Sequence, residues 1–443
     1  MTRRTESKDA ACGAGASPRD ITVGPRGADV QGTTGRAIQL AVDAVALRGG
    51  GTVRVMPGEY VLTDAVRLRS DIALVGDRDR TVLRRGPLVW SPLKVDADVG
   101  QTQITPADPS GFCPGMGVCL RDDRVGWACV STPHLVTDVR DGVLHLADFM
   151  TTDRLAESGG RVVNYFPLIL AENADRCTVD GFTIDAAVDD PDGAISDLRA
   201  AGIYFHHSTD GRIRNVLARH VHGDGMCFGK ASVRMTVEDC EARDNWYYGI
   251  HPGSHSAHST VRRCHIHGNG SDGLYVCWGI HHSTFEDNHV HHNGWLHLRS
   301  GISIGHKDTD NLLQRNHVHE NAKFGICVRR KTAANGAHRC VYRENVIENN
   351  GSRPDQLADI KAQLPPWESV GCGVSICGVT RDLVFEDNRL RETCSGDERT
   401  QQHALCLRDG VSHVTMRGNQ MSGHPGAAVL DESGAADHVL QTE

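Results

Sequence analysis

The chain has 443 residues, a formal net charge of −9 and a sequence pI near 6.3. It has no excess of basic residues and no run of about 18 apolar residues, which argues against a nucleic-acid-binding protein and against a membrane-spanning one. Residues 1–20 lack the apolar segment of a secretory signal, and we predict a disordered tail there. The fifteen cysteines show no paired framework and no zinc-type spacing, so we expect a reducing, cytoplasmic location.

The segment 33–62, "TTGRAIQLAVDAVALRGGGTVRVMPGEYVL", predicts a helix followed by two short strands. The helix begins near a threonine, ends at glycines 49–51, and has one apolar face formed by Ile38, Ala41, Val42 and Val45. With the preceding "GADVQG", this segment resembles the opening of pectate-lyase-like β-helix proteins. The resemblance implies that the helix caps a solenoid.

Residues 88–165 contain "ITPADPSGFCPGMGVCLRDD" and "TDVRDGVLHLADFM", which are typical of short β hairpins. We predict a β-rich insertion here that forms one wall of a cleft. The strand pattern of the main body resumes near residues 177–187.

From residue 202 a glycine followed by an apolar residue recurs at spacings of 23, 24, 24, 28, 24 and 48 residues. Asparagine follows twenty residues after four of these glycines, at Asn245, Asn269, Asn293 and Asn321. A period of about two dozen residues indicates a solenoid in which each repeat forms one coil of short parallel strands. We therefore predict an all-β, single-stranded right-handed parallel β-helix over residues 21–443, with a loop insertion at 351–372. The repeat glycines are Gly202, Gly225, Gly249, Gly273, Gly301, Gly325 and Gly373.

Alternation along each strand places positions 2 and 4 after the repeat glycine on the outside of the solenoid. Because neighbouring coils are about 4.8 Å apart, residues up to 80 positions apart in sequence converge on one outer patch. The outward column reads Tyr204, Cys227, His251, Tyr275, Ser303 and Cys327. The candidate catalytic residues beside it are His251, Tyr248, Tyr275, His306, Lys307 and Asp308. The candidate substrate-binding residues are Arg299, Arg329, Arg330, Lys331, Trp278, Lys230 and Asp310.

Aromatic platforms beside cations suit a sugar or another anionic ring. Proton abstraction next to a carboxylate needs a base, an opposing acid and cations. We therefore predict a carbohydrate-active enzyme of lyase or epimerase type. His251 or His306 would be the base and Tyr248 or Tyr275 the acid, with Lys307 and Arg329 or Arg299 neutralising the carboxylate. The expected partner is a carbohydrate or another small anionic substrate; we expect no cofactor, nucleic acid or membrane, and leave open a monomer or a homo-oligomer such as a trimer.

The stretches "WYYGIHPGS" and "NGSDGLYV" resemble the catalytic region of bacterial mannuronan C5-epimerases, whose motif reads Tyr-Gly-Phe-Asp-Pro-His. Tyr248, Gly249 and Pro252 match this motif, whereas His251 stands at its Asp and Gly253 at its His. The position of Arg299 matches a substrate-binding arginine of that family. The resemblance implies a catalytic role for Tyr248 and leaves the Asp and His of the family unmatched. With "GISIGHKDTDNLL", the same stretches resemble a broad group of bacterial right-handed β-helix repeat proteins.

Three alternatives stay open from sequence. A glycoside hydrolase or transglycosylase would pair Asp308 with Asp272 or Asp310, although an Asp before a repeat glycine, such as Asp224 or Asp272, more often caps the turn. The other two are an isomerase or cyclase of small-molecule metabolism and a non-catalytic glycan-binding solenoid. Cys277, with His251 and His306 on flanking coils, is a candidate nucleophile for which small-residue packing is the favoured interpretation.

Many of the 25 histidines fall into two further columns that face solvent. A stacked histidine ladder can bind a transition metal. We favour a surface decoration repeated by coil duplication, because no carboxylate column completes a site, and we assign no metal. The columns are His265, His289 and His317 at position 16, and His220, His267, His291 and His319 at position 18.

Overall fold

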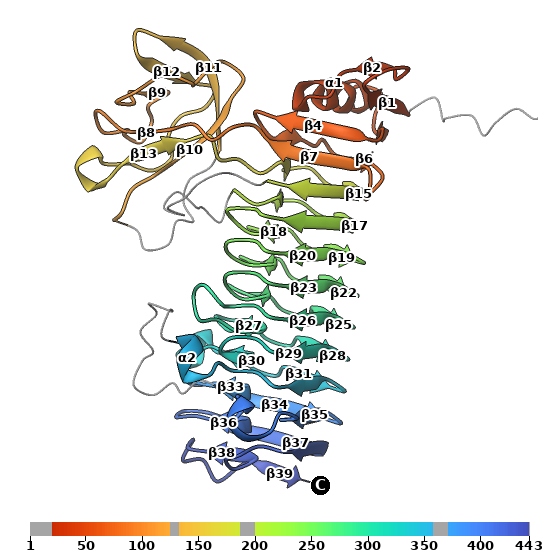
Figure 1. Cartoon of the computed structure of the whole chain (residues 1–443), viewed down its shortest axis with the longest axis vertical. Helices are drawn as coiled ribbons and strands as arrows, with labels where there is room; N and C mark the ends of the chain where they lie inside the picture. Colours follow the sequence, from red (N-terminus) through yellow and green to blue (C-terminus); the bar gives the residue numbers. More distant parts are fainter. Residues whose placement is uncertain (1–19, 125–132, 187–199, 358–370, 443) are drawn as a thin grey trace, which may run out of the picture.

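The computed structural model describes residues 20–124, 133–186, 200–357 and 371–442. The predicted tail at 1–20, apart from Asp20, and most of the predicted loop at 351–372 lie outside the described residues. The described chain winds into a stack of parallel coils with the β-rich insertion beside its N-terminal end (Figure 1), which confirms the predicted fold class. In this part of the chain, no helix has the length and apolar character needed to cross a membrane.

The helix α1 (Gly35–Ala46) covers the N-terminal end of the stack, as the sequence predicts. Thr34 is its N-cap, and the Thr34 side chain accepts a hydrogen bond from the Ala37 N–H at 3.3 Å. The face carrying Ile38, Val42 and Val45 is fully buried against the first coils. The remaining helical segments are short: η1 (Ala156–Ser158), η2 (Ala333–Asn335), α2 (Pro354–Leu357) and η3 (Gly396–Glu398).

The largest sheet carries two parallel runs of strands, so that most coils contribute one strand to each run. Long strands such as β15 and β17 belong to both runs. One run contains β1 (Ile21–Gly24), β3 (Gly51–Val55), β6 (Ile72–Val75), β15 (Thr178–Asp185), β17 (Arg212–Arg219), β19 (Thr236–Glu238), β22 (Thr260–Arg262), β25 (Thr284–Glu286), β28 (Leu312–Gln314), β31 (Val341–Arg343), β34 (Arg381–Glu386), β37 (Ser412–Ser422) and β39 (Val439–Thr442). The other contains β4 (Gly58–Leu62), β7 (Thr81–Arg85), β20 (Glu241–Arg243), β23 (His265–His267), β26 (His289–His291), β29 (His317–His319), β32 (Val346–Glu348) and β35 (Arg389–Arg391), and β2 (Val30–Gln31) pairs with β1.

A second parallel sheet of eleven strands closes the solenoid, and it carries the strands that follow the repeat glycines. Met226 pairs with Ile250, Ile250 with Leu274, and Leu274 with Ile302, which confirms that each glycine starts a new coil in register with the last. Its strands are β5 (Val66–Arg67), β14 (Ile169–Glu172), β16 (Ile203–His206), β18 (Met226–Gly229), β21 (Ile250–Pro252), β24 (Leu274–Tyr275), β27 (Ile302–Ile304), β30 (Phe324–Val328), β33 (Cys372–Ile376), β36 (His403–Leu407) and β38 (Val429–Asp431).

The predicted asparagine ladder runs along the turns between the sheets. The Asn269 side chain donates to Asn293 Oδ1 at 2.8 Å, and that of Asn293 donates to Asn321 Oδ1 at 3.0 Å. Each of these oxygens also accepts a backbone N–H from the coil before it, at 3.2 Å for Asn269 N and 3.1 Å for Asn293 N. The buried polar groups of the turns are thus satisfied from coil to coil.

The insertion forms an antiparallel six-stranded sheet with an apolar core of its own, which includes Val118, Val136 and Leu144. It projects beside the N-terminal coils in Figure 1. Its strands are β8 (Trp90–Pro92), β9 (Gln103–Ile104), β10 (Gly117–Arg121), β11 (His134–Arg140), β12 (Val143–Leu146) and β13 (Arg161–Val163).

Two details differ from the sequence analysis. The column at position 2 points outward but is largely buried, with Tyr204 at 4% and Tyr275 at 6% exposure. Tyr204 is part of the main apolar cluster, and Tyr275 packs with Tyr248 and Cys277. Cysteines also pair: Cys372 and Cys406 form a disulfide between β33 and β36. The two residues are 34 apart in sequence, so only the stacking of coils brings them together.

Candidate functional site

A cleft of about 240 Å³ opens on the outside of the eleven-stranded sheet, across the coils of β21, β24, β27 and β30. Its floor and walls come from the strands themselves, at Tyr275, Ser303 and Cys327, and from the turns before the strands and the loops after them. Among the described residues, none of those lining it belongs to the 88–165 insertion, so the insertion does not form a wall of this cleft. The lining residues are Tyr248, Asp272, Tyr275, Cys277, Trp278, Arg299, Ser300, Ser303, His306, Lys323, Cys327, Arg329, Arg330 and Lys331.

Two stacked phenol rings form one side of the cleft. The rings of Tyr248 and Tyr275 are 4.0 Å apart and within 2° of parallel. His251 lies edge-on to both rings at 5.1 Å, and its Nδ1 is 2.7 Å from Asp224 Oδ2. Burial raises the pKa of both tyrosines, so both hydroxyls are protonated at neutral pH.

Arg329 supports this pair from the next coils. Its guanidinium carbon lies 4.4 Å from the centre of the Tyr275 ring, a cation–π contact. Its nitrogens donate to Ser303 Oγ at 2.7 Å and to the backbone oxygens of Val276 and Gly305 at 2.6 and 2.9 Å. Since these bonds occupy much of its donor capacity, Arg329 holds the wall of the cleft in place as well as contributing positive charge.

The segment "GHKDTD" at 305–310 owes its crowding to one buried anchor. The carboxylate of Asp308 accepts hydrogen bonds from the backbone N–H groups of Gly305, Gly279 and Ile280 at 2.8, 3.0 and 2.9 Å. These bonds tie the loop to the preceding coil, while His306 and Lys307 take positive φ values of 76° and 68°. Burial raises the pKa of Asp308 to about 7, against the opposing effects of Arg329 and these N–H donors.

His306 lines the cleft beside Trp278, with the two rings 4.9 Å apart. The pKa of His306 is lowered by partial burial, then by the charges of Lys331, Arg329 and Lys307. His306 is therefore neutral at neutral pH and able to accept a proton. Trp278 is 48% exposed, so its ring is available to a bound ring.

The cleft is rich in positive charge and carries one carboxylate among its described lining residues, Asp272. Asp272 accepts a hydrogen bond from Ser300 N at 3.0 Å, and burial raises its pKa. The basic residues are Arg299, Lys323, Arg329, Arg330 and Lys331. Arg299 and Arg330 are exposed, whereas Lys323 is 6% exposed.

Most of the residues proposed from sequence meet at this cleft, and five lie outside its lining. His251 lies edge-on to the two tyrosine rings, Asp308 is fully buried, and Lys307 is exposed. Asp310 pairs with Arg339 at 2.7 Å. Lys230 follows β18, where its charge acts on Glu172 and His207. The eight that line it are Tyr248, Tyr275, Trp278, Arg299, His306, Arg329, Arg330 and Lys331.

Sequence reasoning missed Lys323 and assigned Asp272 mainly to turn capping. Both precede a strand of the eleven-stranded sheet, in the same turn row as Tyr248 and Arg299. Tyr248, which lies one residue before its repeat glycine, was among the residues proposed from sequence. Its position could have indicated that the other residues just before a repeat glycine also face the cleft.

The alternatives that need a nucleophile or paired carboxylates receive less support. Burial raises the pKa of Cys277 to about 11, so its thiol is protonated and weakly nucleophilic. Asp308 and Asp310 are engaged elsewhere, which leaves Asp272 without a carboxylate partner among the described residues of the lining. Beside the cleft, Asp224, Cys227 and His251 offer ligand atoms within 4.8 Å of one another, a set that could hold a metal ion.

Comparison with known proteins agrees with the architecture. A family model described as a right-handed β-helix region matches residues 168–341, and no curated protein matches the sequence. The A-module of Azotobacter vinelandii mannuronan C-5 epimerase AlgE4 superposes with a TM-score of 0.56 and 14% identity, over 92% of each chain. The AlgE6 A-module gives 0.55 and 14%, over 92% of this chain and 94% of that one. The Dettilon tailspike protein gives 0.62 and 12%, over 96% of this chain and 67% of that one. The predicted likeness to right-handed parallel β-helix proteins is thereby confirmed.

Proposed function

We propose that this chain binds an anionic, uronate-type carbohydrate in the cleft and transforms it by proton abstraction, as a lyase or an epimerase. The observation that carries the proposal is the composition of the cleft: five basic residues and a neutral histidine face two protonated phenols, with one carboxylate among the described lining residues. The known epimerases that share the fold make this class of substrate a natural one to test.

The basic residues supply the binding and the charge stabilisation. Arg299 is exposed, and none of the described residues forms a hydrogen bond with its guanidinium, so its donors are available to a substrate carboxylate. Arg330 and Lys331 add charge at the other end of the cleft. Removing a proton next to a carboxylate places negative charge on that group, and fixed cations stabilise this charge.

The proton transfers fit His306 and the tyrosine pair. His306 is neutral and faces the cleft, so it serves as the base, in preference to His251, whose Nδ1 is bonded to Asp224. Tyr275 or Tyr248, whose hydroxyls are both protonated at neutral pH, then donates a proton. Trp278 provides a platform on which the sugar ring stacks.

The decisive experiment incubates the purified chain with uronate oligomers in D₂O. A lyase produces an unsaturated product that absorbs in the ultraviolet, an epimerase produces deuterium at the inverted carbon, and a hydrolase produces only new reducing ends. We expect one of the first two. Reducing ends alone would establish the hydrolase, and binding without any product would establish the glycan-binding solenoid.

Variants assign the chemistry to the cleft. Arg299→Gln should raise KM more than it lowers kcat, and His306→Gln should lower kcat. Arg234→Gln is a matched control, because Arg234 is an exposed arginine that pairs with Asp210 on a turn away from the cleft. Full activity in both cleft variants would overturn the proposal.

A further inference from the structure

Six histidines form a two-by-three array on the surface of the largest sheet, on the strands β23, β26 and β29. Each strand has the pattern His–apolar–His, and the register pairs His265 with His289 and His289 with His317 in one column. His267, His291 and His319 pair in the second column. The intervening Ile266, Val290 and Val318 are fully buried, so all six imidazoles point outward.

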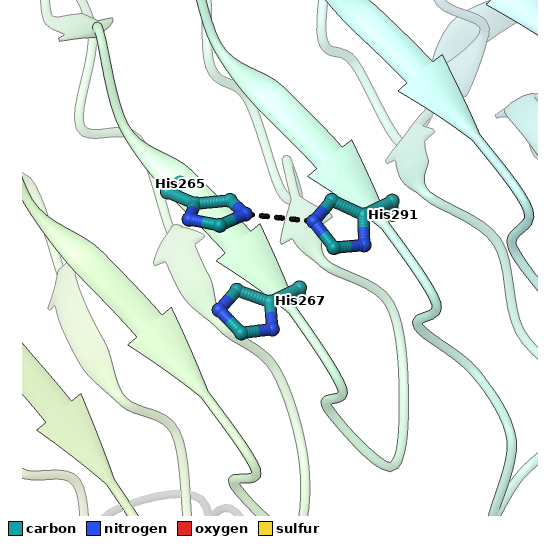
Figure 2. Close-up of side chains that lie close together, drawn as sticks. All are labelled: His265, His267 and His291. Carbon is teal, nitrogen blue, oxygen red and sulfur yellow. Dashed lines mark hydrogen bonds between the residues drawn. The ribbon is translucent and has the colours of Figure 1, made fainter.

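The array is more compact than a row of separate surface residues. Rings within a column stack at 4.8 to 5.1 Å, with planes within 11° of parallel. Rings also meet across the columns: His265 Nε2 lies 2.7 Å from His291 Nε2, shown in Figure 2, and His289 Nε2 lies 2.7 Å from His319 Nε2. Two groups therefore gather three ring nitrogens each within 4.8 Å, His265 with His267 and His291, and His289 with His317 and His319.

The array has no column of carboxylates, but a single carboxylate flanks it at each end. Glu241 Oε1, on β20, is 3.4 Å from His267 Nε2, and Glu348 Oε1, on β32, is 2.9 Å from His317 Nε2. Arginines also contact both carboxylates, Arg78 and Arg243 at Glu241 and Arg391 at Glu348. Each histidine triad thus has one oxygen donor beside it, already held in position.

His220, which the spacing placed in the second column, is absent from the array. Arg219 pairs with Arg243 and Arg243 with His267, so the register gives this place to Arg219. The coil from Gly202 to Gly225 is one residue shorter than the next, which puts His220 out of step, and it bonds Asp185 at 3.0 Å instead.

A carboxylate also lies behind one of the imidazoles. His319 Nδ1 lies 2.8 Å from Glu320 Oε2, and a metal-bound histidine commonly donates its second ring N–H to a carboxylate in this way.

The geometry is also near what an ion requires. Tetrahedral Zn²⁺ with bonds of about 2.0–2.1 Å holds its nitrogens about 3.3 Å apart. The nitrogens of each triad already lie within 4.8 Å, and the closest pairs are at 2.7 Å. Small side-chain rotations therefore suffice to place three nitrogens around one ion.

We infer that the array binds two divalent transition-metal ions of the Zn²⁺, Cu²⁺ and Ni²⁺ class. One ion is held by His265, His267 and His291 beside Glu241, and the other by His289, His317 and His319 beside Glu348. The first joins β23 to β26 and the second joins β26 to β29. Because the ions bind the folded solenoid and bridge successive coils, they also stabilise this part of the stack.

The test uses the full chain without a polyhistidine tag, stripped of metal with a chelator. Titration with Zn²⁺ is followed by calorimetry, and Co²⁺ is used as a second probe because its visible absorption reports coordination by imidazole. We expect two saturable equivalents, a visible Co²⁺ spectrum and a higher Tm with metal.

Two double variants separate the sites. The pair His265→Ala with His291→Ala, and the pair His289→Ala with His319→Ala, should each remove one equivalent or weaken it at least about tenfold. The control pair is His220→Ala with His413→Ala, since both are surface histidines next to an aspartate. Circular dichroism confirms that each variant is folded. No saturable binding, or equal binding by all variants, would overturn the inference.

Discussion

The cleft and the histidine array are built on the same coils, yet they differ in how their columns are composed. Three successive coils repeat the same pair of imidazoles in the array. Over these three coils and the next one, the outward column of the eleven-stranded sheet changes at every step: His251, Tyr275, Ser303 and Cys327. The array therefore repeats one type of side chain. The outward column of the eleven-stranded sheet combines different ones.

Loop length adds to this difference. The array lies on flat strands of three residues, where each coil superposes on the next. The cleft lies where coils are enlarged: the repeat from Gly273 to Gly301 has 28 residues instead of 24, and the extra residues, between Asn293 and Gly301, bring Arg299 to the cleft. A solenoid thus gains a varied site where its repeat is interrupted.

The largest effect should come from His306, the proposed general base. We expect His306→Gln to lower kcat about 100-fold or more, in the range typical of general-base removal, with an unchanged Tm. His281→Gln is the matched control, because His281 is a surface histidine of the preceding coil that does not line the cleft. Equal kcat values for the two variants would show that His306 is not the general base.

The next largest effect should come from a substitution in the asparagine ladder, which lies in the turns between the two sheets. Asn293→Ala removes the oxygen that accepts from Asn269 N, so this buried N–H loses its partner, whereas Asn269 Nδ2 keeps the carbonyl oxygens of Ala242 and His267. The carbonyl oxygen of Ile266 also loses the bond from Asn293 Nδ2. The free energy of unfolding should fall by about 2–3 kcal/mol, measured in urea, since each unsatisfied buried group is worth about 1–3 kcal/mol. Asn335→Ala, at the end of the short helix η2, removes only an exposed side-chain contact with Thr332 and should change it by no more than about 0.5 kcal/mol. A similar loss of unfolding free energy in the two variants would show that the asparagine ladder does not stabilise the stack of coils.

A substitution of Asp308, which anchors the loop carrying His306, should give a smaller loss of unfolding free energy. In Asp308→Asn an amide nitrogen, which is a donor, replaces one carboxylate oxygen and cannot accept the hydrogen bond from Gly305 N. We expect about 1–2 kcal/mol of destabilisation and a higher KM, because the loop that carries His306 loosens. Thermal unfolding and steady-state kinetics measure the two effects. An unchanged KM would mean that the loop keeps its position without the anchor.

The smallest effect concerns pH. Lys307 helps to lower the pKa of His306, so Lys307→Met should raise that pKa towards the ordinary value. A base works when unprotonated, so activity rises with pH through this pKa. The acidic limb of kcat/KM should then move to higher pH by roughly a few tenths of a unit. A loss of rate at every pH would instead place Lys307 in contact with substrate.

The fold could be predicted because its determinants are periodic. Glycine spacing identifies the coils, the asparagines identify the turns, and the apolar face of 38–45 identifies the cap. The site is less predictable, because it depends on how turns and loops fold over the strands. The buried role of Asp308, the engagement of Asp310 by Arg339 and the contribution of Lys323 arise from local backbone geometry that no repeat encodes.

The in-register stacking of coils also determines how such a chain tolerates changes in length. Loss or duplication of one complete 24-residue unit shifts every later residue by a whole coil, so each column continues with its members in phase. Loss of a single strand residue exchanges the inner and outer faces of all that follows in that strand. Recombination between equivalent turns is therefore a permissible route by which a molecule of this kind lengthens, and frame-breaking indels are confined to its loops.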